Sequence, residues 1–203
     1  MPYGYLGVKP NQKVRNAGIL DVTDHAILAK DGYVSDSLEL IQSQTISSGT
    51  TLDFTSIKET GYDVHFIIGR HIETATATNP VDIRLSNDGG SSFEAGTSYE
   101  LAFQYHSPWG TGEVKSTGTD AWDFTSDSQN QDKSSYAYLY NLGNSAKYSY
   151  YTFMSAEDGY GLYGGGVYDT AETINAIRFR AGSAWTGIID LYGVKQVWAT
   201  SDI

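Results

Sequence analysis

Two neighbouring stretches near the C-terminus decide the expected fold: Thr173-Ile-Asn-Ala-Ile-Arg-Phe-Arg180 and Gly187-Ile-Ile-Asp-Leu-Tyr-Gly-Val-Lys195. In the first stretch Ile177 and Phe179 alternate with arginines, which is the two-residue period of a strand with one buried face. The second stretch alternates in the same way. The small residues of 181–186 between them predict a tight antiparallel return, which would place both apolar rows on one side of a sheet.

The composition also favours strands joined by turns. The chain has 203 residues, with 16 Tyr and 22 Gly but only 2 Met and 4 Pro. Tyrosine is enriched in strands and glycine in turns. A chain of this length can bury one substantial core. We therefore expect an all-β protein in which residues 38–203 form a single antiparallel β-sandwich of the jelly-roll kind.

Charge and cysteine content exclude several function classes. The chain carries 13 basic and 24 acidic residues, a formal net charge of -11. Nucleic acid is therefore not an expected partner, because its phosphates would be repelled. Cysteine is absent, which removes disulfides, zinc–thiolate sites and thiol nucleophiles. No run approaches the ~20 apolar residues of a membrane span and no secretory signal is visible, so we expect a soluble protein without membrane insertion.

Residues 1–37 differ from the rest of the chain. Proline and glycine interrupt every period there, and Thr23–Lys30 is the one helical candidate, with Thr23 as its cap and Gly32 as its end. A lone short helix is marginal in water. The segment is either a flexible tail or an arm that docks on the domain or on a partner. We favour an anchoring arm.

The clearest hairpin is expected between Val81–Ser86 and Tyr99–His106, whose apolar residues alternate with polar ones. The link between them begins Ser86-Asn-Asp88-Gly-Gly90-Ser-Ser-Phe93, which resembles the Asp-box of sialidases and other β proteins. In such a box the aspartate accepts backbone N–H groups, glycine supplies positive φ and the aromatic ring packs beneath the turn. The resemblance implies a structural hairpin, and a single copy implies neither a propeller nor a glycosidase.

One histidine lies within the predicted strand Tyr62–Arg70. If Val64, Phe66 and Ile68 share the buried face, then His65 points outward. A metal or catalytic role for His65 is one interpretation. The alternative, which we favour, is an ordinary outward strand histidine, because no second ligand lies at a useful spacing.

The polar segment 107–134 predicts long exposed loops of the kind that carry binding surfaces. Trp109 and Trp122, if exposed, are candidate sugar-stacking platforms, and the alternative is that each plugs its loop against the core. Four aspartates of this segment either gather oxygen ligands for calcium or form a solvated acidic loop, which we favour because their spacing lacks the pattern of a calcium loop. They are Asp120, Asp123, Asp127 and Asp132. No metal and no cofactor is predicted.

Aromatic strands follow this segment. Tyr136 and the alternate tyrosines after it share one side of the stretch 135–143, which is expected to form a hairpin with 147–154. Exposed tyrosines of this kind, Tyr136 first, are also candidate sugar contacts. The glycine-rich run 159–168 lacks the Lys-Ser/Thr pair and the helix of a phosphate loop. It predicts a loop or bulged strand in which the backbone passes close to a neighbour.

Several stretches together resemble one family of proteins. They are Met1-Pro-Tyr-Gly-Tyr-Leu-Gly7, Asp36-Ser-Leu-Glu-Leu-Ile41, Leu52-Asp-Phe-Thr-Ser-Ile57, Tyr62-Asp-Val-His65, Tyr138-Leu-Tyr-Asn-Leu-Gly143 and Leu191-Tyr-Gly-Val-Lys195. With them, the chain resembles short virion-associated proteins of tailed phages, especially marine and cyanobacterial ones, and the jelly-roll domains of tail fibres and capsid decorations. The resemblance implies an exterior virion component that binds other virion proteins as a homo-oligomer, with trimers common in the wider set. It transfers no active-site residue.

Three functions follow from these observations. The favoured one is a non-enzymatic virion protein, a capsid decoration or tail-fibre component on the particle surface, anchored through Tyr3, Tyr5 and Leu6 of its arm. The second is a carbohydrate-binding module that contacts a host surface glycan through Trp109 and other exposed aromatic residues. The third is a glycan hydrolase, which would need facing carboxylates. Its candidates, which carry no spacing signal, are Asp120, Asp123, Glu157 and Asp158.

Overall fold

The computed structural model describes residues 37–76, 80–127 and 131–195. These residues form an all-β domain of ten antiparallel strands, as the sequence predicted, and no helix long and apolar enough to cross a membrane occurs among them. The strands are β1 (Leu38–Phe54), β2 (Val64–Thr74), β3 (Asp82–Ser86), β4 (Tyr99–Ser107), β5 (Gly110–Thr119), β6 (Trp122–Asp123), β7 (Lys133–Tyr140), β8 (Ser149–Glu157), β9 (Tyr160–Tyr168) and β10 (Ala176–Val194). The anchoring arm and the helix expected over Thr23–Lys30 lie outside the described residues.

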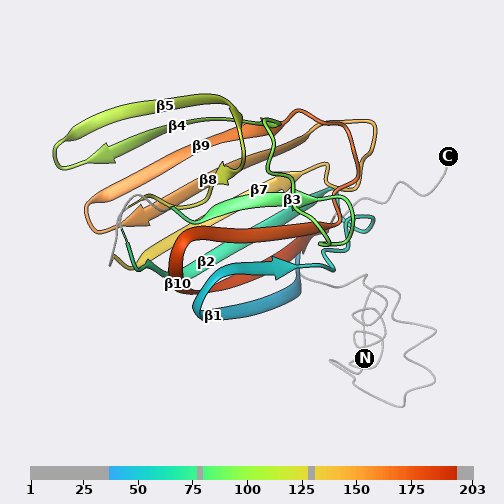
Figure 1. Ribbon diagram of the computed structural model, residues 1–203, viewed down its shortest axis with the longest axis horizontal. Helices are drawn as coiled ribbons and strands as arrows, with labels where there is room; N and C mark the ends of the chain where they lie inside the picture. Colours follow the sequence, from blue (N-terminus) through green and yellow to red (C-terminus); the bar gives the residue numbers. More distant parts are fainter. Residues whose placement is uncertain (1–36, 77–79, 128–130, 196–203) are drawn as a thin grey trace, which may run out of the picture. The chain divides into compact units, whose positions relative to one another are not determined.

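The strands form a large and a small layer that share β1 and β10 (Figure 1). The large layer runs in the order β5-β4-β9-β8-β7-β2-β10-β1, and the small layer in the order β6-β3-β10-β1. The first part of β10, Ala176–Arg180, pairs with β3. Its second part, from Trp185 to Val194, pairs with β2. The sheet therefore folds over along β1 and β10 into a sandwich that is nearly a closed barrel.

The C-terminal stretches form one long strand, so the predicted tight return is wrong. β10 runs without interruption from Ala176 to Val194, and β1 pairs with it on both sides of the bend. The small residues between Ala181 and Trp185 let the backbone curve from one layer into the other. Two of the three register shifts of β1 lie between Ile46 and Thr51, where the strand follows the same bend. Bulges of this kind bend a strand while keeping its pairing.

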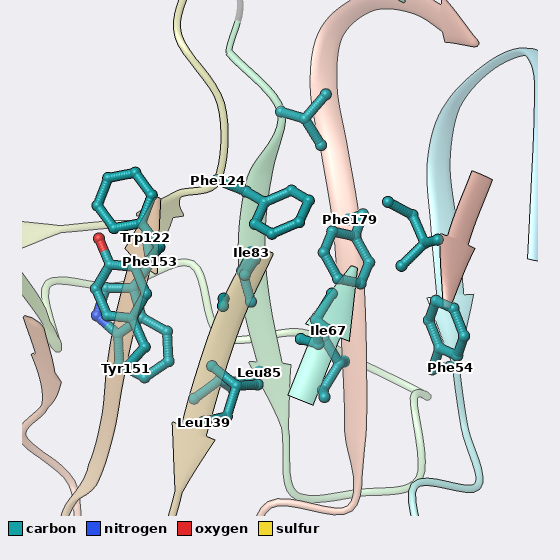
Figure 2. Close-up of a cluster of buried hydrophobic side chains, with 14 of the residues drawn as sticks. Phe54, Ile67, Ile83, Leu85, Trp122, Phe124, Leu139, Tyr151, Phe153 and Phe179 are labelled. Atoms are coloured by element: carbon teal, nitrogen blue, oxygen red, sulfur yellow. The ribbon is translucent and has the colours of Figure 1, made fainter. Parts of the chain in front are cut away.

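The core lies between the inner faces of the two layers. Figure 2 shows large side chains from both layers meeting there, among them Trp122, Phe124, Tyr151 and Phe179, each at most 1% exposed. Trp122 stacks on Tyr151 with ring centroids 4.5 Å apart. Phe124 meets Phe179 edge to face at 5.2 Å. Such pairs add to the free energy gained by burying apolar area.

The alternation of most strands predicts which residues are buried, and β2 is the exception. Ile83 and Leu85 of β3 and Ile177 and Phe179 of β10 point into the core, as expected. In β2 the expected faces are reversed: His65 is fully buried, whereas Phe66 is on the outer side. Both faces of β2 carry apolar residues, because its outer face belongs to an aromatic surface described below. Alternation alone cannot choose between two apolar faces.

Two predicted connections are wrong and one is confirmed. β3 pairs with β10 and β6, while β4 pairs with β5 and β9, so the expected β3–β4 hairpin does not form. The expected long loop after Ser107 is instead a tight turn into strand β5. β7 and β8 form the predicted hairpin.

The glycine-rich run is the central strand β9, between β4 and β8. A Cβ atom on Gly164 or Gly166 would collide with the backbone of β4. The predicted close backbone approach is therefore confirmed, and glycine is required by the space available rather than by the backbone angle. The expected loop or bulge is wrong, because β9 pairs with both neighbours without a register shift.

Candidate functional site

The outer side of the large layer carries a broad surface of aromatic and aliphatic side chains, which we call the aromatic face. Its members project from β1, β10, β2, β7, β8 and β9 and alternate with buried residues. They are Leu40, Phe66, Ile68, Tyr136, Tyr138, Tyr140, Tyr150, Met154, Tyr163 and Tyr192. Leu40 is 52% exposed, and Tyr136, Tyr150 and Tyr163 are each more than 40% exposed.

Strand register arranges the aromatic face in rows. The middle row runs from Leu40 across Tyr192, Phe66 and Tyr138 to Thr152, because these residues are direct cross-strand partners. Phe66 stacks on Tyr138 with centroids 4.6 Å apart and lies 6.2 Å from Tyr192. Close packing of rigid rings along a row fixes their positions before any partner binds, which lowers the entropy cost of binding.

Charge is scarce on the aromatic face. Asp190 is the one charged residue among the described members of the face and their direct cross-strand partners in β1, β2 and β7 to β10. Its side chain is 6% exposed. Its carboxylate accepts hydrogen bonds from Arg70 Nη2 at 2.7 Å and from Ser43 Oγ at 2.5 Å. The guanidinium of Arg70 neutralises it at the border of the face. A surface with this composition is suited to an apolar partner.

The area of the aromatic face matches that of a protein contact. Six strands about 4.8 Å apart and three rows about 7 Å apart cover roughly 600 Å². This is at the upper end of the largest apolar patches on monomeric proteins, and it approaches the ~800 Å² that one partner contributes to a standard interface.

The structure separates the three predicted sugar-binding residues. Trp109 lies in the turn between β4 and β5 and is 91% exposed, and Tyr136 lies on the aromatic face. Strands β8 and β9 stand between the strands that carry them. Trp122 is fully buried, so it is no exposed platform, and the alternative that it packs its loop against the core is confirmed. Its ring stacks in the core, and its Nε1 donates to the carbonyl of Val167 at 3.4 Å.

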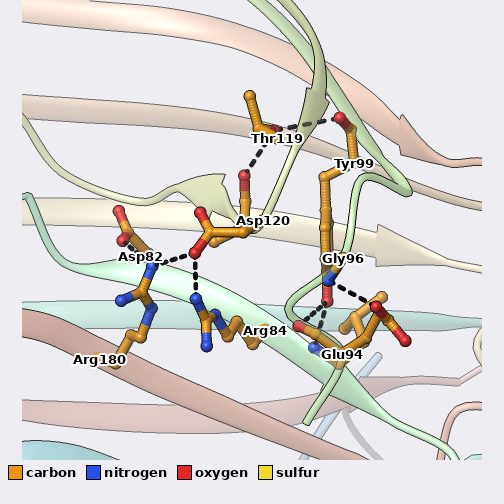
Figure 3. Close-up of polar contacts among 10 residues, drawn as sticks. Asp82, Arg84, Glu94, Gly96, Tyr99, Thr119, Asp120 and Arg180 are labelled. Carbon is orange, nitrogen blue, oxygen red and sulfur yellow. Dashed lines mark hydrogen bonds and ion pairs between the residues drawn. The ribbon is translucent and has the colours of Figure 1, made fainter.

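The outer side of the small layer is charged and paired. Figure 3 shows Arg180 between Asp82 and Asp120, with Arg84 also bonded to Asp120. Arg180 Nη2 lies 3.3 Å from Asp82 Oδ2 and 3.0 Å from Asp120 Oδ2. Burial, and then the carboxylate of Asp123, raises the pKa of Asp82 to about 7, although Arg180 opposes the shift.

Among the remaining acidic candidates, Asp120, Asp123 and Asp127 lie close enough for their charges to interact. Asp132 contacts the His71 ring at 3.2 Å, while Asp120 belongs to the arginine cluster. Glu157 ends β8, and Asp158 lies in the turn before β9. Among the residues that the structure describes, no three acidic or histidine side chains are grouped as metal ligands would be.

The Asp-box forms the local structure that its sequence predicts, although the strands beside it do not pair. The carboxylate of Asp88 accepts hydrogen bonds from Ser86 Oγ at 2.8 Å and from Ser92 N and Oγ at 2.9 and 2.6 Å. These bonds lower the pKa of Asp88 to about 2. Gly90 has a φ of 88°, and the Phe93 ring packs under the Arg178 guanidinium at 4.0 Å. The box is a surface turn held by its own side chains.

His65 is a core residue, so the expectation that it points outward is wrong. Its Nε2 lies 2.8 Å from the carbonyl oxygen of Ile57. Burial lowers the pKa of His65, because the charged imidazolium would be desolvated. A neutral histidine that ties β2 to the segment after β1 explains this position without a ligand.

Sequence reasoning missed most of the aromatic face. Tyr136 was the one member proposed as a binding residue. Phe66 and Ile68 were expected on the buried face of their strand, and Tyr163 was not a candidate. A signal was present: β2 has apolar residues on both of its faces, and the tyrosines of β7 recur at every second position. Two apolar faces on one strand indicate a second contact surface beside the core.

No protein-family model matches the chain, and no curated protein is significantly similar to it.

Proposed function

We propose that this chain is a non-enzymatic structural protein that works by binding other subunits through its aromatic face. The observation that carries the proposal is the near-continuous apolar surface over six strands, in which the one carboxylate is neutralised by Arg70. Water contact with so large an apolar patch is unfavourable, and a matching surface on a partner relieves it. A second copy of the chain supplies such a surface through a symmetric contact.

The resemblance to virion-associated proteins of tailed phages supports a particle as the place where these subunits meet. In this proposal the domain is a capsid decoration or tail-fibre component on the exterior of a virion. Residues 1–37, with Tyr3, Tyr5 and Leu6, anchor it. Repeated weak contacts would then act together, as in other multivalent assemblies.

The test of the aromatic face is self-association of the full chain measured by sedimentation velocity. Tyr138→Lys places a charge at the middle of the face and should shift the protein toward monomer by at least tenfold in the dissociation constant. Thr117→Lys on β5 adds the same charge at an exposed site outside the face and should leave association unchanged. A native protein that stays monomeric at high concentration, or equal effects of both variants, would refute the contact.

The virion assignment needs its own test. The chain should be found by mass spectrometry in purified particles of a phage that encodes it, and a particle reconstruction should show which protein residues 1–37 touch. A variant that lacks 1–37 should keep its strand content by circular dichroism but be absent from particles. Particles that retain the truncated protein at native level would exclude the arm as the anchor.

A second candidate function is glycan binding through Trp109. Its indole lies at the turn between β4 and β5 and is exposed, and it has the amphipathic form that stacks on sugar rings. Glycan-array binding that disappears in Trp109→Ala would support this function. Binding that persists in that variant, or none at all, would count against it.

A further inference from the structure

The sandwich is open at one edge, and a cleft of about 270 Å³ lies there. It is bounded by the inner faces of β4, β5 and β9 and by the segment 123–127, which contains the end of β6. Tyr105 and Tyr160 form an aromatic wall, with rings stacked 5.6 Å apart and only 12° from parallel. Phe103 and Leu162 line the cleft from the core side. The volume is suited to a single side chain or a fragment of similar size.

One rim of this cleft is acidic, and the charges that act on its more buried carboxylate are negative. Asp123 and Asp127 both line it. Asp123 is largely buried, and the neighbouring charges that act on it are those of Asp127 and Asp120, both negative. Together with burial they raise the pKa of Asp123 to about 6. A cation that acts on Asp127 is Lys133, while Arg180 is paired with Asp82 and Asp120.

A second, uncharged group at the cleft lacks a partner. Ser126 lines the cleft and is 3% exposed, and its hydroxyl has no hydrogen-bond partner in the described part of the chain. The preceding residue, Thr125, is different, because its hydroxyl accepts from Val81 N at 2.9 Å. A buried hydroxyl without a partner costs free energy that a bound polar group would recover.

We propose that this cleft binds a small organic cation, a primary ammonium or guanidinium group such as the end of a lysine or arginine side chain. The aliphatic part of such a group would lie along Phe103 and Leu162, and its charged end would meet the carboxylate of Asp123. The faces of Tyr105 and Tyr160 attract a cation further. Ser126 supplies an acceptor oxygen for one N–H. A neutral ligand would leave Asp123 with only negative charges acting on it.

The proposal is tested with the full chain and two matched probes. N-acetyl-lysine methylamide carries the ammonium group, whereas N-acetyl-norleucine methylamide has a similar shape without it. Titration followed by NMR should give a Kd on the order of 1 mM for the lysine probe. The shifts should centre on residues 103–105, 123–127 and 160–162. The norleucine probe should bind at least tenfold more weakly.

Variants separate this site from general attraction to an acidic protein. Asp123→Asn should weaken binding of the lysine probe at least tenfold. The variant should fold at least as stably as the native chain, because the substitution removes a buried charge among negative neighbours. Asp127→Asn, at the exposed rim, is the second variant and should weaken binding severalfold. Asp169→Asn removes an exposed carboxylate after the far end of β9 and should change nothing.

The competing outcomes are clear. Equal binding of both probes, or tight binding of a neutral saccharide in the same cleft, would overturn the cation assignment. If Asp169→Asn reduces the NMR chemical-shift changes caused by the lysine probe as strongly as Asp123→Asn does, the attraction is nonspecific. Absence of saturable binding by either the lysine or the matching arginine probe would refute the site.

Discussion

Replacing Trp122 by phenylalanine tests whether this side chain holds the core or serves a ligand. The indole is fully buried, stacks on Tyr151 at 4.5 Å and meets Tyr99 edge to face at 5.4 Å. Phenylalanine has about three fewer non-hydrogen atoms, and each buried carbon contributes roughly 0.8 kcal/mol. The small cavity left behind adds to this loss. The free energy of unfolding should therefore fall by about 2–4 kcal/mol.

Urea denaturation followed by far-UV circular dichroism measures this change without relying on tryptophan fluorescence. With a slope of about 2 kcal/mol per molar urea, the midpoint should fall by roughly 1–2 M at an unchanged slope. Trp109→Ala is the matched control: its side chain is 91% exposed, so its stability should stay within about 0.5 kcal/mol of native. A midpoint for Trp122→Phe within error of native would refute the burial argument, as would a large loss in Trp109→Ala.

Three further predictions concern polar and steric contacts inside the domain. Tyr99→Phe should lower the free energy of unfolding, measured by urea denaturation, by about 1–3 kcal/mol. Leu85 N donates to the Tyr99 hydroxyl at 2.8 Å, and this hydrogen bond between the two layers is lost in the variant. A decrease below about 0.5 kcal/mol would show that water replaces the hydroxyl. Because the pKa of Asp82 is raised to about 7, the folded state keeps a proton that the unfolded chain releases, so stability should decline from pH 4 to 7. In Asp82→Asn the decrease in the free energy of unfolding between pH 4 and 7 should be smaller by on the order of 3 kcal/mol. A pH profile parallel to that of the native protein would contradict the raised pKa of Asp82. Gly166→Ala should destabilise by more than about 2 kcal/mol, because its Cβ would collide with the Glu100 carbonyl; a native melting temperature would show that β9 can move aside.

The sequence was most informative where a strand has one apolar and one polar face. β3 and the first half of β10 have such faces, and their buried residues were predicted correctly. β2 has two apolar faces, so the alternation did not show which face is buried, and His65 was placed on the wrong side. A period of two defines the faces of a strand but does not say which of them meets the core.

Long-range pairing was the other limit. Twelve residues separate β3 from β4, and their alternation is compatible with a hairpin, yet each strand finds its partners elsewhere. The same limit hid the cleft, since Tyr105, Asp123 and Tyr160 come from three separate strands. The position of Trp122 stayed open for a related reason: its polar neighbours in the chain indicate a loop, but the layers enclose the ring. Properties that depend on which strands meet cannot be recovered from local periodicity.

The pairing of β1 with β10 has a consequence for how the domain is made in a cell. The earliest and the latest strands of the described chain are neighbours, from Leu38 opposite Val194 to Phe54 opposite Ile177. A ribosome must therefore release almost the entire polypeptide before this seam can close. Until then β1 emerges with no native neighbour and the nascent sandwich stays unfinished. Premature termination within β10 should accordingly yield insoluble fragments instead of a shortened, working domain.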